Sequence, residues 1–242
     1  MQPTKSKLLS PLKYHGGKSY LARRIIGLMP PHRSYVEPFA GGLNVLLNKE
    51  PRIEITNDID RDLINFWRQL RESIDFFHEY VPSLKYERST FLDSKVLVTH
   101  DDDRVRAMWY LVRNRMSRGG FGEDFGWSER LRGKKHGNPI PGDVNAWRTM
   151  IRNLDTVSKR IARTGFASLD FMSFFESIES TLDVDIDDSS VLVYADPPYH
   201  PDTRTAKDAY QNEMTDLQHR VLIEWFWEMG CKVMVSGYRC PL

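Results

Sequence analysis

VLVYADPPY, residues 191–199, is the stretch that decides the fold of this 242-residue chain. Its first five residues form an unbroken apolar run, the pattern of a strand buried on both faces of a parallel sheet. Prolines cannot continue the hydrogen-bond ladder, so we expect the strand to end before Asp196. Ligands of open α/β sheets bind beyond the carboxyl ends of the strands. The stretch therefore puts a carboxylate, a rigid turn and an aromatic ring where a ligand would bind.

These residue types suit an exocyclic amine on a flat ring. Asp196 and the carbonyl of Pro197 would accept the two amine hydrogens, and Tyr199 would offer a flat face for stacking. The alternative is an ordinary loop that starts with two prolines, and these residues alone do not decide between the two interpretations.

Strand-like runs alternate with helical stretches on both sides of this stretch, which indicates an α/β fold. We expect strands at 33–37, 52–56, 165–169 and 231–235, and helices at 62–80, 105–115 and 147–162. Leu43 reads as the start of a helix after a glycine turn. Thr215-Asp216-Leu217-Gln218 has the pattern of a capping box, and we expect Leu217 and Leu222 on the buried face of the helix that follows.

The charge is unevenly distributed along the chain, although the net charge is only +1. Residues 104–163 hold 14 Lys and Arg against 5 Asp and Glu, a net +9, so the rest of the chain carries −8. A basic block inside an acidic chain is typical of a nucleic-acid-binding insertion, the alternative being a solvated helical surface. We therefore predict a catalytic domain from 1–80 and 164–242, and a basic insertion at 81–163.

Several classes of protein do not fit the sequence. Residues 1–12 lack a signal-peptide core, and no apolar run reaches the length of a membrane span. The 2 cysteines form no framework, and the 7 histidines show no ligand spacing. We expect a cytoplasmic protein without a metal or a membrane partner.

The segment Gly16-Gly17-Lys18-Ser19 looks like the end of a phosphate-binding P-loop. The first glycine of that motif would fall on Leu12, and no clear strand precedes it, so we reject a nucleotide-triphosphate site.

A nucleoside-containing cofactor is indicated further along the chain. The turn at 37–42 begins with an acidic residue and ends with paired glycines, which let backbone N–H groups approach a ligand. Asp58, at the end of the next strand, is placed to accept hydrogen bonds from a ribose. Asp170-Phe171 offers an acceptor and a flat face for an adenine, or is simply a surface Asp beside a core Phe.

The basic block mixes cations with aromatic rings, a combination that suits phosphate contact and base stacking. Its members are Arg113, Arg115, Arg118, Phe121, Phe125 and Trp127.

The chain resembles the Dam-type (D12 class) DNA adenine-N6 methyltransferases along nearly its whole length. The resemblance is carried by LKYHGGK at 12–18, VEPFAGG at 36–42, NDID at 57–60, Asn114-Arg115 with Gly120 after it, and DPPY at 196–199. It implies a Rossmann-like S-adenosylmethionine-dependent methyltransferase sheet with an inserted, mainly helical target-recognition domain. The implied reaction is transfer of a methyl group to the N6 amine of an adenine flipped out of DNA.

Together the residues and the resemblance give the expected site. The catalytic set is Asp196, Pro197, Pro198 and Tyr199. The set for S-adenosylmethionine is Tyr14, Lys18, Glu37, Pro38, Phe39, Gly41, Gly42, Asp58, Asp170 and Phe171. The DNA-binding set is Arg113, Asn114, Arg115, Arg118 and Arg204. The resemblance implies a bacterial or phage-encoded enzyme, with or without a restriction partner.

Two features depart from the family pattern. Leu43 stands where the glycine turn often has a small residue, and relatives add a final pair of strands beyond residue 238, so we expect those strands to be missing here. The alternatives are an impaired or inactive DNA-binding relative, an RNA adenine methyltransferase, or an unrelated α/β enzyme with another nucleoside cofactor. Asp196 argues against cytosine-N4 and glutamine targets, because the enzymes for those targets usually carry Ser or Asn at that position.

Overall fold

The computed structural model describes residues 7–14, 16–128, 131–132, 140–182, 188–203 and 212–238. The chain divides into two compact units, each assembled from separate stretches of sequence. The first unit comprises Met1–Arg23, Gly42–Lys49 and Asn65–Ala162, and the second comprises Arg24–Gly41, Glu50–Ile64 and Arg163–Leu242. All but the last residue of the basic segment 104–163 therefore falls in the first unit.

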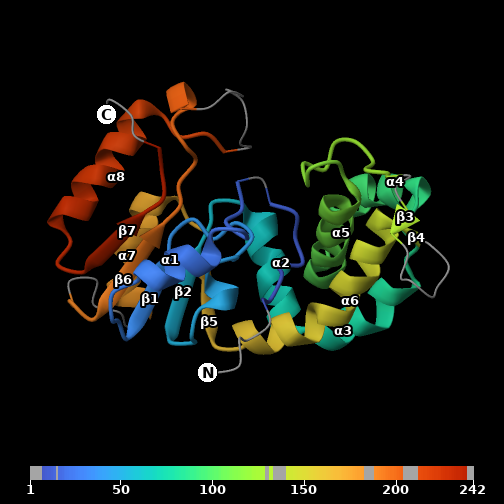
Figure 1. Ribbon diagram of the computed structural model, residues 1–242, viewed down its shortest axis with the longest axis horizontal. Helices are drawn as coiled ribbons and strands as arrows, with labels where there is room; N and C mark the ends of the chain where they lie inside the picture. Colours follow the sequence, from blue (N-terminus) through green and yellow to red (C-terminus); the bar gives the residue numbers. More distant parts are fainter. Residues whose placement is uncertain are drawn as a thin grey trace. The chain divides into compact units, whose positions relative to one another are not determined.

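A five-stranded parallel sheet forms the centre of the second unit (Figure 1). The strands lie in the order β5 (Thr164–Ala167), β2 (Ile53–Asn57), β1 (Ser34–Glu37), β6 (Val191–Ala195) and β7 (Lys232–Val235). All five residues of β6 are buried, as the apolar run predicted. The α/β fold with a parallel sheet is thus confirmed, and each expected strand matches an observed one to within two residues.

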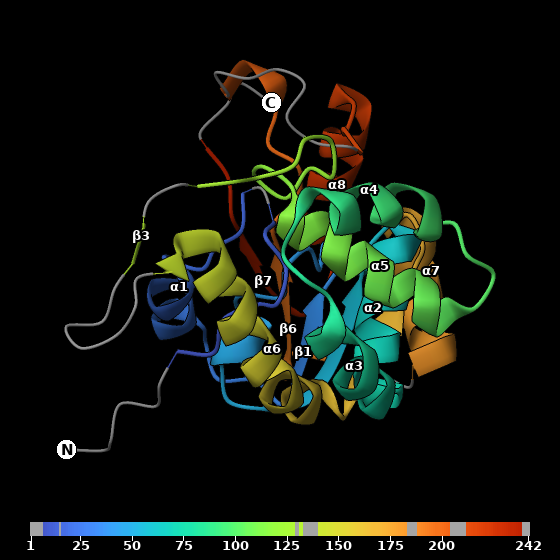
Figure 2. The same ribbon diagram turned by 90° about the vertical axis from the view of Figure 1, so that its right-hand side faces the viewer.

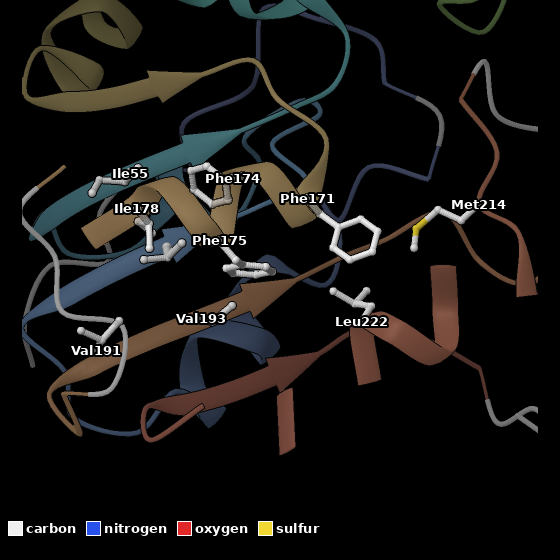
Figure 3. Packing of buried hydrophobic residues seen from close by; sticks show 10 residues of the cluster. Ile55, Phe171, Phe174, Phe175, Ile178, Val191, Val193, Met214 and Leu222 are labelled. Atoms are coloured by element: carbon white, nitrogen blue, oxygen red, sulfur yellow. The ribbon is translucent and has the colours of Figure 1, made fainter. Parts of the chain in front are cut away.

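One face of this sheet is covered by an aromatic helix, α7 (Phe171–Leu182). Figure 3 shows the rings of Phe174 and Phe175 and the side chain of Ile178 above Val193 and its neighbours on the sheet. The spacing of these residues puts them on one side of the helix, so that they leave water together when the helix packs on the sheet.

The helix α8 (Asp216–Glu228) adds Leu222 to the same core. The capping box predicted at its start is confirmed: the Gln218 N–H donates to the Thr215 hydroxyl at 3.2 Å, and the Thr215 N–H donates to the Gln218 side chain at 2.8 Å. The expectation for Leu217 is wrong, because this side chain is 70% exposed. The core at this end of α8 is formed by Met214, before the helix, and by Leu222, while the side chain of Leu217 lies in solvent.

The first unit is mainly helical (Figures 1 and 2). Its helices are α3 (Ile74–Tyr80), α4 (Arg88–Leu97), α5 (Asp103–Met116) and α6 (Gly142–Ile161), with most of α2 (Arg61–Glu72) and the short 3₁₀ helices η1 (Leu46–Asn48) and η2 (Val81–Ser83). The helix expected at 62–80 is broken at Ser73, which has non-helical backbone angles. The remaining elements of the chain are α1 (Ala22–Leu28), β3 (Leu131–Arg132), β4 (Ile140–Pro141) and η3 (Pro201–Thr203). None of the described helices is long and apolar enough to cross a membrane.

The helix expected to begin at Leu43 does not form. Leu43 has a φ of 51°, in the left-handed region that disfavours an L side chain, and only the 3₁₀ helix η1 follows. This residue is fully buried, so its side chain packs inside the protein although its backbone is strained.

Truncation of Phe174 tests the aromatic core. This side chain is fully buried, and Phe174→Ala should lower the free energy of unfolding by about 3–5 kcal/mol. Leu217→Ala, on an exposed helical position, should change it by less than about 0.5 kcal/mol. Urea unfolding followed by circular dichroism measures both, and equal effects of the two substitutions would contradict this account of the core.

Candidate functional site

Acidic side chains stand at the carboxyl ends of four neighbouring strands of the second unit. Glu37 is the last residue of β1, Asp58 follows β2, Asp170 follows β5 by three residues, and Asp196 follows β6. Because the strands are parallel, all four carboxyl ends lie at one edge of the sheet. This edge is where a ligand of such a fold binds, and it carries acceptors in a row.

Asp58 and the glycine turn, both predicted to bind a cofactor, contact each other directly. One carboxylate oxygen of Asp58 accepts the Gly41 N–H at 2.9 Å, and the other accepts the Asp60 N–H at 3.0 Å. Gly41 has a φ of 46°, a conformation that glycine adopts without strain. Only 8% of Asp58 is exposed, and burial raises the pKa of its carboxyl to about 6 in spite of these hydrogen bonds.

Glu37 is buried and accepts a hydrogen bond from a neighbouring tyrosine. The hydroxyl of Tyr35, two residues earlier on the same face of β1, donates to the Glu37 carboxylate at 3.0 Å. Burial, followed by the charge of Glu37, raises the pKa of Tyr35 well above its ordinary value, so the hydroxyl keeps its proton. After Glu37 the chain turns through Pro38 to Phe39, whose ring lies 6.2 Å from that of Phe171.

Asp170 and Phe171 have structural partners. One Asp170 oxygen accepts the N–H groups of Met172 and Ser173 at 3.1 Å, and the other accepts the Ser173 hydroxyl at 2.7 Å. These hydrogen bonds cap α7 and lower the pKa of Asp170. Phe171 belongs to the core under α7. Their contact with an adenine stays a prediction.

The loops at this edge are joined by Asn57, which the sequence indicated only as the first residue of the segment NDID at 57–60. Its side-chain nitrogen donates to the carbonyls of Pro38 at 3.2 Å and Leu169 at 2.9 Å, and its oxygen accepts the Leu169 N–H at 2.9 Å. One side chain thus ties the loop after β1 to the loop after β5. An Asn that ends a strand is a weak sequence signal, because its partners are distant in the chain.

The predicted catalytic motif, residues 196–199, directly follows β6 and contacts the segment after β7. The Ser236 N–H donates to the Ala195 carbonyl at 2.8 Å, and the hydroxyls of Ser236 and Tyr194 share a hydrogen bond of 2.7 Å. The ring of Tyr199 meets the edge of Tyr238 with centroids 5.2 Å apart. Tyr199 was predicted from the sequence as a site residue, whereas Tyr238 was not, because its contact with Tyr199 depends on the pairing of β7 with β6.

The loop after the motif is fixed to α8 by His200. Its Nε2 lies 2.9 Å from a carboxylate oxygen of Asp216, the first residue of α8, and its carbonyl accepts the N–H and hydroxyl of Thr203. The ring of His219, one turn into α8, lies 5.7 Å from that of His200. No spacing in the sequence indicated this contact, which joins positions 16 residues apart.

The predicted cofactor residues of the N-terminal motif lie in the first unit. Lys18 is buried and its Nζ donates to the Gly16 carbonyl at 2.8 Å. The carbonyl of Tyr14 accepts the Gly17 N–H at 3.1 Å, which closes a tight turn. Gly42 lies against this turn, since a Cβ there would come within 3.0 Å of the Cβ of Tyr14.

The predicted DNA contacts differ in how much of each side chain is available. Arg118 is exposed, whereas Arg113 donates to the Gly122 carbonyl at 3.1 Å and Arg115 donates to the Ala146 carbonyl at 3.3 Å. Burial lowers the pKa of Arg115. Asn114 is buried within the unit. Arg204 lies outside the described residues.

Metal-ligating side chains do not converge in groups of three or more anywhere among the described residues. What the acidic edge of the sheet offers a ligand is therefore a set of hydrogen-bond acceptors and negative charge.

Comparison with known proteins gives one family. Residues 14–120 match the D12 class N6 adenine-specific DNA methyltransferase family. The chain is 30% identical over 203 residues to the DNA adenine methylase of Vibrio cholerae serotype O1, an alignment that covers 81% of this chain and 66% of that protein. It is 26% identical over 260 aligned positions to a type II methyltransferase of Lactococcus lactis subsp. cremoris, covering 100% of this chain and 85% of the relative. The DNA N-6-adenine-methyltransferase of Escherichia phage P1 is 30% identical over 111 residues, 43% of this chain and 14% of that protein.

The raised pKa of Asp58 predicts a pH-dependent stability. A carboxyl whose folded pKa is about 6, above its ordinary value, stabilises the fold at low pH and loses that contribution as the pH rises through 6. Relative to Asp58→Asn, the wild-type protein should therefore gain about 1 kcal/mol of unfolding free energy between pH 7 and pH 5.

Urea titrations at the two pH values measure this difference. Asp188→Asn serves as the control, because hydrogen bonds from Ser190 lower the pKa of Asp188 and move its titration below this interval. A difference between wild type and Asp58→Asn that stays constant from pH 7 to pH 5 would contradict the assignment.

Proposed function

This chain belongs to the D12 class of N6 adenine-specific DNA methyltransferases, and we propose that it transfers a methyl group from S-adenosylmethionine to the N6 amine of adenine in DNA. The observation that carries the proposal is the row of carboxylates at the carboxyl ends of four adjacent parallel strands, with Asp196 and its proline turn on β6. The aligned region covers about two thirds of the Vibrio proteins, so the activity of those proteins is part of the proposal.

The donors and acceptors at this edge fit the proposed cofactor. S-adenosylmethionine supplies an electrophilic methyl group on a positively charged sulfonium and carries a ribose with two hydroxyls. Asp58 is a buried carboxylate with the geometry to accept hydroxyl hydrogens, and Glu37 adds negative charge on the neighbouring strand. Burial disfavours the ionised form of Asp58, as its raised pKa indicates, so a positively charged ligand would stabilise this carboxylate.

In the first unit we assign Tyr14, Lys18 and Gly42 to cofactor binding on the resemblance of their motifs. Pro38, Phe39, Gly41, Asp170 and Phe171 complete the assigned set in the second unit.

The catalytic motif would act by orienting the amine. An adenine inside a duplex is out of reach, so the base is flipped out of the stack. The Asp196 carboxylate and the Pro197 carbonyl accept the two N6 hydrogens, which directs the nitrogen lone pair toward the methyl group. Asp196 also stabilises the positive charge that develops on N6, and Tyr199, braced by Tyr238, stacks on the base.

DNA binding is assigned to the basic segment of the first unit. The net charge of +9 over residues 104–163 is complementary to the negative charge of a phosphate backbone. Arg118 is the predicted DNA contact whose side chain is exposed. Its backbone is held in a turn, because its N–H donates to the Asp124 carbonyl and its carbonyl accepts the Phe121 N–H.

Replacement of Asp196 tests the reaction. Asp196→Ala should lower the methyl-transfer rate by about 10²–10³-fold, because the charge developing on N6 loses its counter-charge. Asp188→Ala, in the turn before the same strand, should leave the rate unchanged. The measurement is transfer of labelled methyl to double-stranded DNA, single-stranded DNA and RNA, with the product nucleoside identified by mass spectrometry.

N6-methyladenine that forms in DNA with wild type and is lost in Asp196→Ala would establish the reaction. Product in RNA alone would favour the RNA alternative, and a folded wild-type protein that binds DNA without forming product would favour a binding role. Activity retained in Asp196→Ala would remove this residue from the mechanism.

Arg118 provides a separate test of DNA binding. Arg118→Ala should weaken binding and reduce the slope of log K against log salt by about 1, as expected for the loss of one phosphate contact. Lys159→Ala removes the same charge from an exposed position of the same basic segment, beside Asp155, and should leave the slope unchanged. Fluorescence anisotropy at several salt concentrations measures both; equal slopes for the two variants would indicate a general charge effect and no specific contact at Arg118.

A further inference from the structure

The N-terminal motif and the turn that follows α5 are joined by one buried side chain in the first unit. Asn114, which is 7% exposed, accepts the Lys13 N–H at 2.8 Å through its amide oxygen. Its amide nitrogen donates to the carbonyls of Lys13 at 2.9 Å and Gly120 at 3.0 Å. Both backbone groups of Lys13 are thus paired by a residue 101 positions away.

The Lys13 side chain adds a further hydrogen bond between the N-terminal motif and the end of α5. Its Nζ donates to the Ser117 carbonyl at 3.2 Å. The Ser117 hydroxyl donates to the Asn114 carbonyl at 2.9 Å and accepts the Gly122 N–H at 2.9 Å. The end of α5, the turn after it and the N-terminal motif are therefore held together by a continuous set of hydrogen bonds.

The contact requires a glycine at one position. Gly120 has a φ of 88°, and a Cβ on this residue would lie 2.0 Å from the Lys13 carbonyl oxygen. Such an overlap with the backbone cannot be relieved by rotating a side chain. A side chain at 120 would push the turn away from Lys13 and break the hydrogen bonds of Asn114.

Lys13 directly precedes the turn that carries Tyr14 and Lys18, the two residues assigned to the cofactor. The Tyr14 carbonyl accepts the Gly17 N–H, and the Lys18 Nζ donates to the Gly16 carbonyl, so the turn is fixed internally once its first residue is fixed. Its placement within the first unit therefore depends on the hydrogen bonds of Lys13, together with the packing of Gly42 against Tyr14.

We propose that Asn114 is a positioning residue for the segment 13–18, to which cofactor binding is assigned. Through Asn114, the affinity for the cofactor depends on the conformation of the turn after α5, residues 117–122. This inference rests on the proposed function. Asn114 was predicted to contact DNA; here both ends of its amide act inside the protein, on Lys13 and Gly120. DNA that holds the turn after α5 in place would also hold Lys13 in place through Asn114, and the cofactor would act in the opposite direction. Each ligand would therefore reduce the loss of conformational entropy that the other incurs on binding, and the two would bind cooperatively.

Two substitutions break the connection by different means. Asn114→Ala removes its three hydrogen bonds, and Gly120→Ala keeps Asn114 but introduces the overlap with Lys13. The matched control is Gly119→Ala. Gly119 also has a positive φ, of 66°, but a Cβ there meets only the side-chain ring of Phe121, which is exposed, and no backbone atom of Lys13.

Each variant would be titrated with S-adenosylhomocysteine by calorimetry in the absence of DNA, and exchange of the Lys13 amide hydrogen would be followed by NMR. Asn114→Ala and Gly120→Ala should each weaken binding about tenfold or more, raise the KM for S-adenosylmethionine with kcat within about twofold, and speed exchange at Lys13. Gly119→Ala should match wild type in all three. A purely structural role would lower the unfolding midpoint without changing the affinity of the folded protein.

The outcomes separate this inference from the proposed function. No binding of S-adenosylhomocysteine by the wild-type protein would overturn the proposed function and this inference with it. Binding by wild type, with unchanged affinity in folded Asn114→Ala and Gly120→Ala, would overturn the inference alone.

Discussion

The site in the second unit depends on the hydrogen bonds of a single buried amide, that of Asn57. A parallel sheet brings the carboxyl ends of its strands to one edge, but the loops beyond that edge are irregular and leave backbone groups without ladder partners. Asn57, which is 1% exposed, supplies those partners to the loops after β1 and β5. The positions of the glycine turn and of the start of α7 follow from it, because each lies within a few residues of a bonded carbonyl.

The same edge concentrates negative charge in a place with little water. Asp58 receives two backbone hydrogen bonds that favour its ionised form, yet burial outweighs them and its pKa is raised to about 6. Glu37 accepts a hydrogen bond from the Tyr35 hydroxyl. Burial thus disfavours the ionised form of Asp58, and a positive group brought near it would stabilise that form.

Local patterns in the sequence predicted the parts of the fold that local physics controls. The apolar run before the prolines became the fully buried β6, and the capping box at Thr215 became the start of α8. Predictions failed where a distant contact decides the outcome. Leu217 fits the helical pattern, but Met214 and Leu222 fill the core there and Leu217 stays exposed. Leu43 fits a helix start, but its backbone turns into the left-handed region.

The site shows the same division between local and distant control. Asp58 and the glycine turn could be singled out from spacing and do contact each other, because a strand, its turn and the next strand are contiguous in the sequence. The contact of His200 with Asp216 was not, because nothing in a single sequence indicates which helix start receives the loop after the motif. Asp170 was predicted to bind a ligand, and in the structure it caps α7, since a carboxylate at a strand end is equally suited to a helix start.

Asn57 and Asn114 solve one physical problem in the two units. Where two irregular segments meet, no ladder pairs their backbones, and a buried unpaired N–H or C=O costs about as much as a lost hydrogen bond. A side-chain amide carries a donor and an acceptor on one group, so a single Asn can pair both backbone groups of a residue, as Asn114 does for Lys13 and Asn57 for Leu169. Such a residue stands next to the ligand-binding segments without needing to touch a ligand. Its substitution would change binding through the segments it holds, and this indirect effect is hard to distinguish from a direct contact when only activity is measured.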